Sequence, residues 1–460
     1  MNAHESQLRE LRQALSSGRA NVARVSVPAG RALSLVDAEI GSAGVFWEEG
    51  APSAGPPTTF VGLDTASHLK ESGTERFHAM VEAQARVFSE LRAEPALVGQ
   101  LRFFGGSAFT TGRDGSGCWE DFGDSTFVLP RVLYIDRPEG AELLAIDPAS
   151  APGGTEHTLA VVAQALAALD APGGAPVPPA QVESRRESAG EREFEELVAL
   201  AQERIRAGRV DKVALARRET LTLSVAPRVG VLLERLRKTA QGATRFAFRI
   251  GERTFVGATP ECLVKRQDLL VETEALAGTA AKSDSEARAA LLASAKDQDE
   301  HRYVVEALKS ALGPLCRRLD VAPEAVIKEL PQLLHLCTPI KGQLERPLHV
   351  LELVMRLHPT PAVCGSPTAE ALRFIVEHEA APRGWYAAPF GWADARGNGH
   401  FVVGLRSALL HGKNVHLYAG AGIVRGSKPK LEYEETELKL QSIRSALGLG
   451  IGIPSSAPPA

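Results

Sequence analysis

The chain has 460 residues, of which 44% are hydrophobic and 23% are charged, a composition typical of a globular protein with a large core. Its 52 basic and 56 acidic side chains leave a net charge of −4, which excludes a general attraction to nucleic acid or to an anionic membrane. We therefore expect neither partner, and an anionic ligand would have to be held by local positive charges.

The cysteines and the N-terminus indicate the compartment. The five cysteines are odd in number and show neither zinc-ligand nor CxxC spacing, which favours reduced thiols in the cytoplasm. The first residues, MNAHESQLRELRQAL, are charged and lack an apolar signal-peptide core. No run of about 18 apolar residues occurs along the chain. The sequence therefore predicts a soluble, cytoplasmic protein.

The first third of the chain is rich in predicted strands. Aromatic and β-branched residues between Gly-rich turns favour an antiparallel sheet over βαβ units. We expect Trp47, Phe103 and Trp119 to belong to the core. The elements predicted here are helices at about 5–16 and 74–93, and strands at 22–27, 44–49, 58–63, 100–106 and 125–135.

A helical pattern at 158–170 is followed by the Pro/Gly/Ala-rich run APGGAPVPPA, residues 171–180. Such a composition is typical of a flexible connector. This connector either separates two domains or forms a surface loop within one domain.

After the connector, helical and strand-like patterns alternate up to a tail, GIPSSAPPA, that we expect to be disordered. The predicted helices cover about 191–207, 228–239, 285–312, 347–357, 367–379 and 428–447. The predicted strands cover 212–224, 244–250, 254–257, 261–266, 269–274, 325–330, 333–341, 385–393, 400–410 and 414–419.

Two pairs of acidic residues lie in predicted helices. Asp297 and Glu300 are three residues apart and share a helical face, as do Glu432 and Glu435 in the last helix. If the two faces met, their carboxylates could hold Mg²⁺, which prefers a few carboxylates together with waters and an anionic ligand. The same spacing fits a solvated acidic face.

Lys212 and Glu261 are candidates for acid–base chemistry. Lys212 opens the apolar run KVALARR, where desolvation would favour its neutral form and make it a general base. Glu261 follows Gly257-Ala258-Thr259-Pro260 and, if buried near a second carboxylate, would keep its proton and act as a general acid. The alternatives are a lysine that extends to solvent at a strand edge and an ordinary turn carboxylate.

Glycine-containing segments follow two predicted strands, Ala277-Gly278-Thr279 and Gly420-Ala421-Gly422. We expect both to be turns. Gly420, Gly422 and Gly426 form GxGxxxG, which differs by one residue from the dinucleotide-binding pattern. Backbone N–H groups at such a turn could hold a carboxylate, although glycines in plain turns have the same pattern.

The order of the motifs is more informative than any one of them. The series is KVALARR, ATPECLV, EALAGTA, KDQDEH, LHLCTPIKG, LHPTPAVCGSP, RGWYAAPFGW, VGLRSALL, YAGAGIVRGSKP and EYEETELK. This series, which spans about 190–447, resembles the chorismate-utilising enzymes. That family includes isochorismate, salicylate, anthranilate and aminodeoxychorismate synthases.

The resemblance implies an α+β fold in which two antiparallel β-sheets pack together with helices outside and the site in a cleft. It implies one domain over 1–448, made of an N-terminal part (1–170), a connector (171–184) and a catalytic core (185–448), with a disordered tail at 449–460. The connector would then be a loop.

The resemblance also implies roles for individual residues, matched motif by motif. Lys212 matches the base that activates water, and Glu261 matches the general acid. Mg²⁺ is the expected cofactor, with Glu300 and Glu435 as ligands and Asp297 and Glu432 in support. The residues expected to bind substrate are Gly278, Thr279, His335, Tyr386, Arg406, Gly420, Gly422 and Lys439.

Two positions favour one branch of the family. Aminating relatives carry a lysine in a PIKGT turn where this chain has Ala277, and they usually lack a lysine at position 212. The Pro-Ile-Lys-Gly at 339–342 belongs to the His335 strand motif, so Lys341 is not that nucleophile. We expect water to be the incoming nucleophile, and hence an isochorismate synthase acting in menaquinone or siderophore biosynthesis.

Three alternatives are kept. A salicylate synthase shares the lysine base, but the turn HPTPAVCGSP resembles isochorismate synthases more closely. An ammonia-dependent anthranilate or aminodeoxychorismate synthase would need an ammonia source, and the chain has no obvious glutaminase segment with a GxCxG-like turn. A non-catalytic relative would bind chorismate without turnover. We expect chorismate as the small-molecule partner and no obligate partner subunit.

Overall fold

The computed structural model describes residues 3–16, 20–50, 57–112, 115, 117–171, 179–282, 286–330 and 333–449. Residues 172–178, half of the predicted connector at 171–184, and all but the first residue of the predicted tail lie outside these ranges. Within the described ranges, no helix combines the length and the apolar character needed to cross a membrane.

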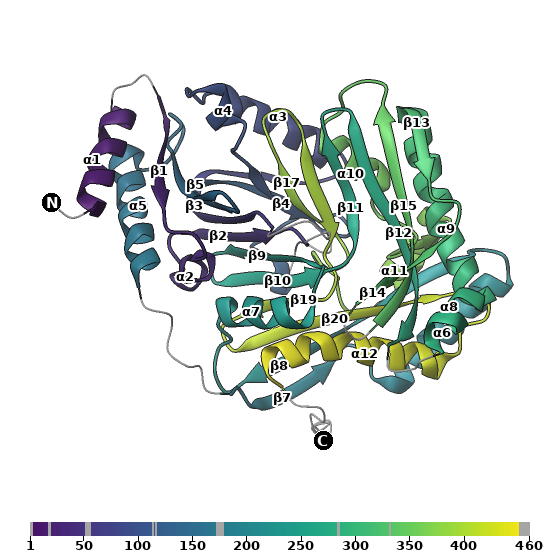
Figure 1. The fold of residues 1–460 in the computed structure, drawn as a ribbon. Helices are drawn as coiled ribbons and strands as arrows, with labels where there is room; N and C mark the ends of the chain where they lie inside the picture. Colours follow the sequence, from purple (N-terminus) through teal and green to yellow (C-terminus); the bar gives the residue numbers. More distant parts are fainter. Residues whose placement is uncertain are drawn as a thin grey trace.

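The strands pair antiparallel in two sheets that curve around a common core (Figure 1). The order in the first sheet is β1, β6, β5, β3, β2, β9, β10, β19, β20, β8 and β7, with the two-residue β16 also paired to β8. Their bounds are β1 Val22–Val27, β6 Gly140–Ile146, β5 Ser125–Arg137, β3 Thr59–Glu71, β2 Ala43–Glu48, β9 Thr244–Ile250, β10 Arg253–Thr259, β19 Ser407–His411, β20 Asn414–Ile423, β8 Lys212–Leu223, β7 Val182–Glu187 and β16 Gly365–Ser366.

The second sheet runs in the order β4, β17, β18, β11, β12 and β15, with β13 and β14 one after the other along the far edge of β15. The long strand β5 joins the two sheets because β4 and β6 pair with successive parts of its edge. The bounds are β4 Phe103–Ser107, β17 Pro389–Ala393, β18 Gly399–Val403, β11 Cys262–Gln267, β12 Leu270–Ala281, β15 Leu333–Leu344, β13 Cys316–Val321 and β14 Val326–Glu329.

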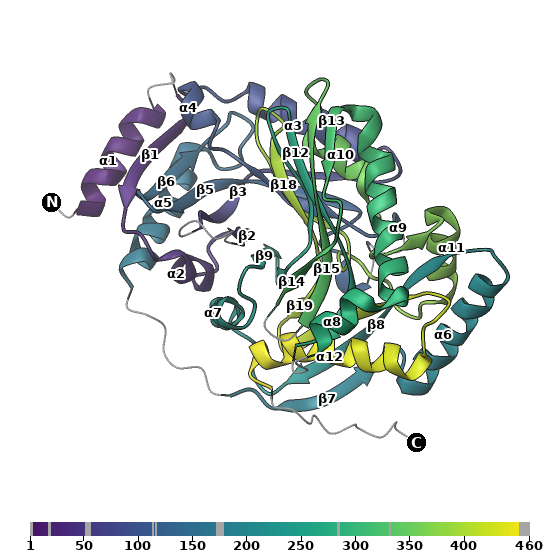
Figure 2. The same ribbon diagram turned by 45° about the vertical axis from the view of Figure 1, so that its right-hand side comes forward.

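Helices cover the outer faces of both sheets (Figures 1 and 2). Helix α9 lies along β12, and α12 lies along β20, so these two helices approach each other across the end of the sheets. The helices are α1 Ala3–Ser16, α2 Ala32–Asp37, α3 Arg76–Ser89, α4 Pro95–Val98, α5 Gly154–Asp170, α6 Glu191–Arg206, α7 Val229–Thr239, α8 Ala287–Ala293, α9 Ala295–Leu312, α10 Val350–Leu357, α11 Thr368–His378 and α12 Pro429–Leu447.

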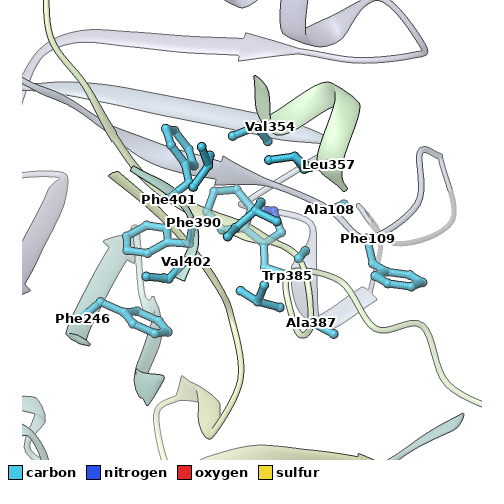
Figure 3. Close-up of a cluster of buried hydrophobic side chains, with 14 of the residues drawn as sticks. Ala108, Phe109, Phe246, Val354, Leu357, Trp385, Ala387, Phe390, Phe401 and Val402 are labelled. Atoms are coloured by element: carbon cyan, nitrogen blue, oxygen red, sulfur yellow. The ribbon is translucent and has the colours of Figure 1, made fainter. Parts of the chain in front are cut away.

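Aromatic side chains fill the space between the sheets (Figure 3). The ring centroids of Phe246 and Phe390, one from each sheet, are 5.0 Å apart. The predicted core residues Trp47, Phe103 and Trp119 are fully buried, as expected. Burial of such rings removes a large apolar area from water, so this layer fixes the distance between the sheets on which the site is built.

The α+β prediction with two antiparallel sheets and outer helices is confirmed. The single domain over 1–448 stays a prediction, although β2 of the N-terminal part pairs with β9, and β4 pairs with β17. Two predicted turns were wrong. Gly420 and Gly422 lie inside β20, opposite Ala216 and Ala214 of β8. Gly278 lies inside β12 at a bulge.

The remaining differences concern element boundaries. The helix predicted at 285–312 is two helices, because Ser294 ends α8 and its side chain caps α9 by accepting from the Asp297 N–H. The strand predicted at 400–410 is interrupted between β18 and β19. Strands β6, β7 and β13 and the short helices α2 and α4 were not predicted.

Candidate active site

A cleft with about 770 Å³ of empty space, open solvent at its mouth included, lies where the ends of β8, β12 and β20 meet α9 and α12. Most of the predicted site residues line it. They are Glu261, Gly278, Thr279, Glu300, His335, Tyr386, Arg406, Gly420, Gly422, Glu435 and Lys439. The remaining three, Lys212, Asp297 and Glu432, lie behind this lining.

Lys212 is the first residue of β8, and its side chain is fully buried. Its Nζ lies 2.9 Å from Glu300 Oε1, within ion-pair distance, yet forms no well-oriented hydrogen bond with any described residue. Gly422 makes this approach possible, since a β-carbon there would come within 2.1 Å of Glu300 Oε1. Lys212 is thus a buried amino group directly behind the Glu300 carboxylate.

Glu261 occupies the short connection between β10 and β11 and is 5% exposed. Burial, reinforced by the negative charge of Glu274, raises the pKa of the Glu261 carboxyl to about 8. The ammonium groups of Lys212 and Lys439 act in the opposite direction. At neutral pH this carboxyl is mostly protonated, which is the state a general acid needs.

His335 on β15 is held in its neutral form at the β12 bulge. Burial and the neighbouring Arg406 lower its pKa to about 3. Its Nδ1 lies 3.0 Å from the Gly278 carbonyl oxygen and 3.2 Å from Thr279 Oγ1. A neutral ring that donates from Nδ1 to Gly278 leaves Nε2 to accept from Arg406 Nη2, 3.5 Å away.

Gly278 has a φ of +73°, and the bulge that it forms turns this backbone toward the cleft. Arg406, between β18 and β19, also has a positive φ, +48°, which is uncommon for a residue with a side chain. Two unusual backbone positions therefore present a bulge and a guanidinium to the same cleft wall.

On the α12 side, Lys439 Nζ donates to the Gly420 carbonyl oxygen at 2.8 Å and contacts Glu435 Oε1 at 2.5 Å. Burial alone would raise the pKa of Glu435, but Lys439 lowers it below its usual value. Glu435 is therefore ionised in the cleft and carries a negative charge opposite Glu300.

Asp297 and Glu432 complete the acidic group without reaching the cleft surface. Burial raises the pKa of Asp297, and burial together with Glu435 raises that of Glu432. Lys296 Nζ contacts Glu432 Oε1 at 2.7 Å and offsets part of this charge. The acidic faces of α9 and α12 therefore meet, which excludes the interpretation of the two carboxylate pairs as a purely solvated surface.

The carboxylates at the cleft are chemically suitable ligands for a hard cation, but they are not already arranged as a complete metal site. As they stand, no three His, Cys, Asp or Glu side chains in the described ranges are gathered closely enough to hold a metal ion. Mg²⁺, however, needs only one or two carboxylates when waters and an anionic ligand complete its shell. Glu300 and Glu435, which face the cleft from two helices, are the side chains suited to this role.

Three further positions bear on the reaction. Tyr386 lines the cleft and stacks on Tyr418 with centroids 5.1 Å apart. Ala277 presents only a methyl group to the cleft. Lys341 is exposed and pairs with Glu272 at 2.9 Å on the surface of the sheet, outside the cleft lining.

Sequence reasoning missed Arg383, which also lines the cleft. Its guanidinium donates to the carbonyl oxygens of Val363 and Ala214, both at 2.7 Å, and pairs with Glu379. It therefore ties β8 to the segment before β16. A lone arginine in the apolar motif APRGWYAAPFGW was the signal that could have identified it.

Comparison with known proteins places this cleft in a family. The sequence model described as "Chorismate binding enzyme" matches residues 10–448. The chain belongs to the chorismate-binding enzymes.

Named relatives are similar to this chain over most of their lengths. The salicylate biosynthesis isochorismate synthase of Pseudomonas aeruginosa is 37% identical over 419 residues, 88% of this chain and 84% of that protein. The isochorismate synthase MenF of Bacillus subtilis is 32% identical over 420 residues, 88% and 87% of the two chains. The structure of MenF, the menaquinone-specific isochorismate synthase from Escherichia coli, superposes with a TM-score of 0.80 at 27% identity, covering 97% of this chain and 99% of that one.

Proposed function

We propose that this chorismate-binding enzyme is an isochorismate synthase, which adds water at carbon 2 of chorismate as the 4-hydroxyl leaves. The observation that carries the proposal is a buried Glu261, with its raised pKa, in the same cleft as Glu300, with Lys212 directly behind Glu300. Relatives named isochorismate synthase, at 37% and 32% identity over 88% of this chain, support it.

The reaction needs an acid and a base. Hydroxide is a poor leaving group, so Glu261 protonates the 4-hydroxyl as it departs. Water is a weak nucleophile, so Lys212 takes its proton in the neutral amine form, and the ammonium group that results has Glu300 beside it as a counter-ion. Each such transfer typically contributes about 10²–10⁴-fold to the rate.

The substrate is a dianion, and the cleft offers positive charge at two places. Arg406, with the neutral His335 beside it, and Lys439 are suited to bind carboxylates, and Gly278 and Thr279 line the same cleft. We propose that Glu300 and Glu435 hold Mg²⁺, supported by Asp297 and Glu432. A bound Mg²⁺ would neutralise and orient the ring carboxylate.

The position of the lysines favours water over ammonia as the nucleophile. Residue 277 is an alanine in the cleft wall, and Lys341 is exposed on the sheet surface. A covalent adduct at either position is therefore not supported. We further infer a cytoplasmic enzyme that needs no ammonia-supplying subunit and that serves menaquinone or siderophore biosynthesis.

The test is chromatography of the products formed by purified protein from chorismate and Mg²⁺ without ammonia. Isochorismate as the main product is the expected result. Salicylate with pyruvate would move the enzyme to the lyase branch, and anthranilate or aminodeoxychorismate formed only with ammonia would overturn the argument from Ala277. Binding of chorismate without any product would identify a non-catalytic relative.

A further inference from the structure

The backbone that carries Glu261 is held on one side by β18. The Val403 N–H donates to the Glu261 carbonyl oxygen at 3.1 Å, and Thr259 Oγ1 donates to the Val403 carbonyl oxygen at 2.7 Å. The Glu261 N–H is 3.3 Å from Thr259 Oγ1. These contacts fix one edge of the turn and leave its other edge, at Pro260 and Cys262, to be fixed by other groups.

Glu274 and Lys328 hold that other edge. Lys328 Nζ, from β14, donates to the Pro260 carbonyl oxygen at 2.7 Å and to Glu274 Oε1 at 2.6 Å. Glu274, on β12, accepts from the Cys262 N–H at 3.2 Å through the same oxygen. The residues on either side of Glu261 are thus joined through one ion pair, whose side chains are only 17% and 27% exposed.

We propose that Glu274 and Lys328 act as a positioning pair for the proposed general acid, holding the Glu261 turn in place and setting the charge around its carboxyl group. The role of Glu261 as a general acid rests on the proposed function, whereas the contacts of Glu274 and Lys328 with its turn do not. Neither residue lines the cleft, so neither touches substrate.

The two members of the pair have opposite electrostatic effects. The charged groups around Glu261 are Glu274 on β12, Lys328 on β14, Lys212 on β8 and Lys439 on α12. The polar Tyr386 lies nearby as well. After burial, Glu274 is the largest influence that raises the pKa of Glu261, whereas Lys328 is one of the three lysines that lower it.

Opposite charges predict opposite responses, which a purely structural role would not produce. In Glu274→Gln, a negative charge is lost and Lys328 is left without its counter-ion, so the pKa of Glu261 falls. In Lys328→Met, a positive charge is lost and Glu274 is left uncompensated, so the pKa of Glu261 rises. Neighbouring charges at such sites typically shift a carboxyl pKa by about 1–3.

The experiment is a ¹³C NMR titration of the full chain labelled at its glutamate carboxyl groups, with Glu261→Gln used to assign the resonance. We expect the Glu261 midpoint to move down by about 1 in Glu274→Gln and up by about 1 in Lys328→Met. Lys328→Arg should restore the wild-type midpoint. The titration needs no turnover, so it can succeed even if the isochorismate assay fails, and the two failures are distinguishable.

A matched control lies two residues away on the same strand. Glu272 pairs with Lys341 at 2.9 Å, but these side chains are 49% and 69% exposed, so Glu272→Gln should leave the Glu261 midpoint unchanged. Thermal unfolding of each variant shows whether it is folded, and Lys328→Met and Glu274→Gln test the proposal separately. Midpoints that stay fixed, or that move in the same direction in both variants, would overturn it.

Discussion

Gly422 lies so close to Glu300 that a β-carbon on residue 422 would come within 2.1 Å of Glu300 Oε1 and 3.1 Å of Lys212 Cε. The glycine sits in a regular strand, opposite Ala214, so its role here is to leave space rather than to adopt a special backbone angle. The Lys212–Glu300 pair therefore requires a residue without a side chain at position 422.

Gly422→Ala should displace Glu300 and lower turnover by about 10²-fold, the usual cost of misplacing a catalytic group by about 1 Å. It should also raise the Mg²⁺ concentration needed for half-maximal activity. Gly426→Ala is the control, because its β-carbon would meet only Lys296 side-chain atoms at 3.9 Å or more, an ordinary contact. Equal kinetics of the two variants would show that the Gly422 contact has no influence on the site.

Lys212→Met should lower kcat by about 10²–10⁴-fold, because the methionine keeps the volume of the buried stem but cannot accept a proton from water. The fold should survive, because the methionine fills the buried volume and the Glu300 carboxylate, left without its partner, lines the open cleft, where water can reach it. Circular dichroism and the kinetics of product formation check both statements. Lys341→Met, at the exposed lysine, should retain wild-type activity, and activity close to wild type in Lys212→Met would rule out the proposed base.

The sequence predicted which residues gather at the cleft better than how they are arranged there. The apolar run KVALARR allowed two interpretations of Lys212, a buried lysine or one that extends to solvent, and in the structure its side chain is buried. The contact between the acidic faces of α9 and α12 could not be derived from spacing, because the same spacing suits a solvated helix. That contact depends on tertiary packing between segments more than a hundred residues apart, as the Lys296–Glu432 pair, separated by 136 positions, illustrates.

The glycine segments show why two turns were wrongly predicted. Glycine is common in turns, so Gly278 and Gly420 favoured that interpretation. In the structure Gly278 forms a bulge, and Gly420 allows the close approach of β8, since a β-carbon there would lie 2.5 Å from the Leu215 carbonyl oxygen. A local pattern cannot distinguish a glycine that turns the chain from one that makes room for a neighbouring strand.

Glu435→Gln should weaken Mg²⁺ and chorismate binding together, because one carboxylate charge is lost where we propose that the cation and the ring carboxylate meet. We expect the Mg²⁺ titration midpoint and the KM for chorismate each to rise by about tenfold, equivalent to about 1.4 kcal/mol. Isothermal titration with Mg²⁺ and steady-state kinetics provide the two measurements.

The exposed neighbour Glu434 gives the matched control for Glu435→Gln. Glu434→Gln removes the same charge from the same helix but from a side chain outside the cleft lining. It should leave both constants unchanged. A Glu435→Gln enzyme with an unaltered Mg²⁺ titration would exclude Glu435 as a ligand.

Glu261→Gln should make the protein more stable than wild type in alkaline solution. The pKa of Glu261 rises from 4.5 to about 8 on folding, so its contribution to stability is fully present below pH 4.5 and is lost as the pH rises through 8. The whole shift corresponds to at most about 5 kcal/mol of unfolding free energy, and glutamine, which cannot ionise, avoids this loss.

Urea unfolding of wild type and Glu261→Gln at pH 5, 7 and 9 measures this difference, which should grow with pH while the variant loses activity. Glu434→Gln, at an exposed carboxylate, should unfold in parallel with wild type throughout. If the curves of Glu261→Gln and wild type also stayed parallel, the carboxyl would not hold its proton at neutral pH. The loss expected for wild type is the free energy that the fold gives up to keep an uncharged acid in a cleft built to bind anions.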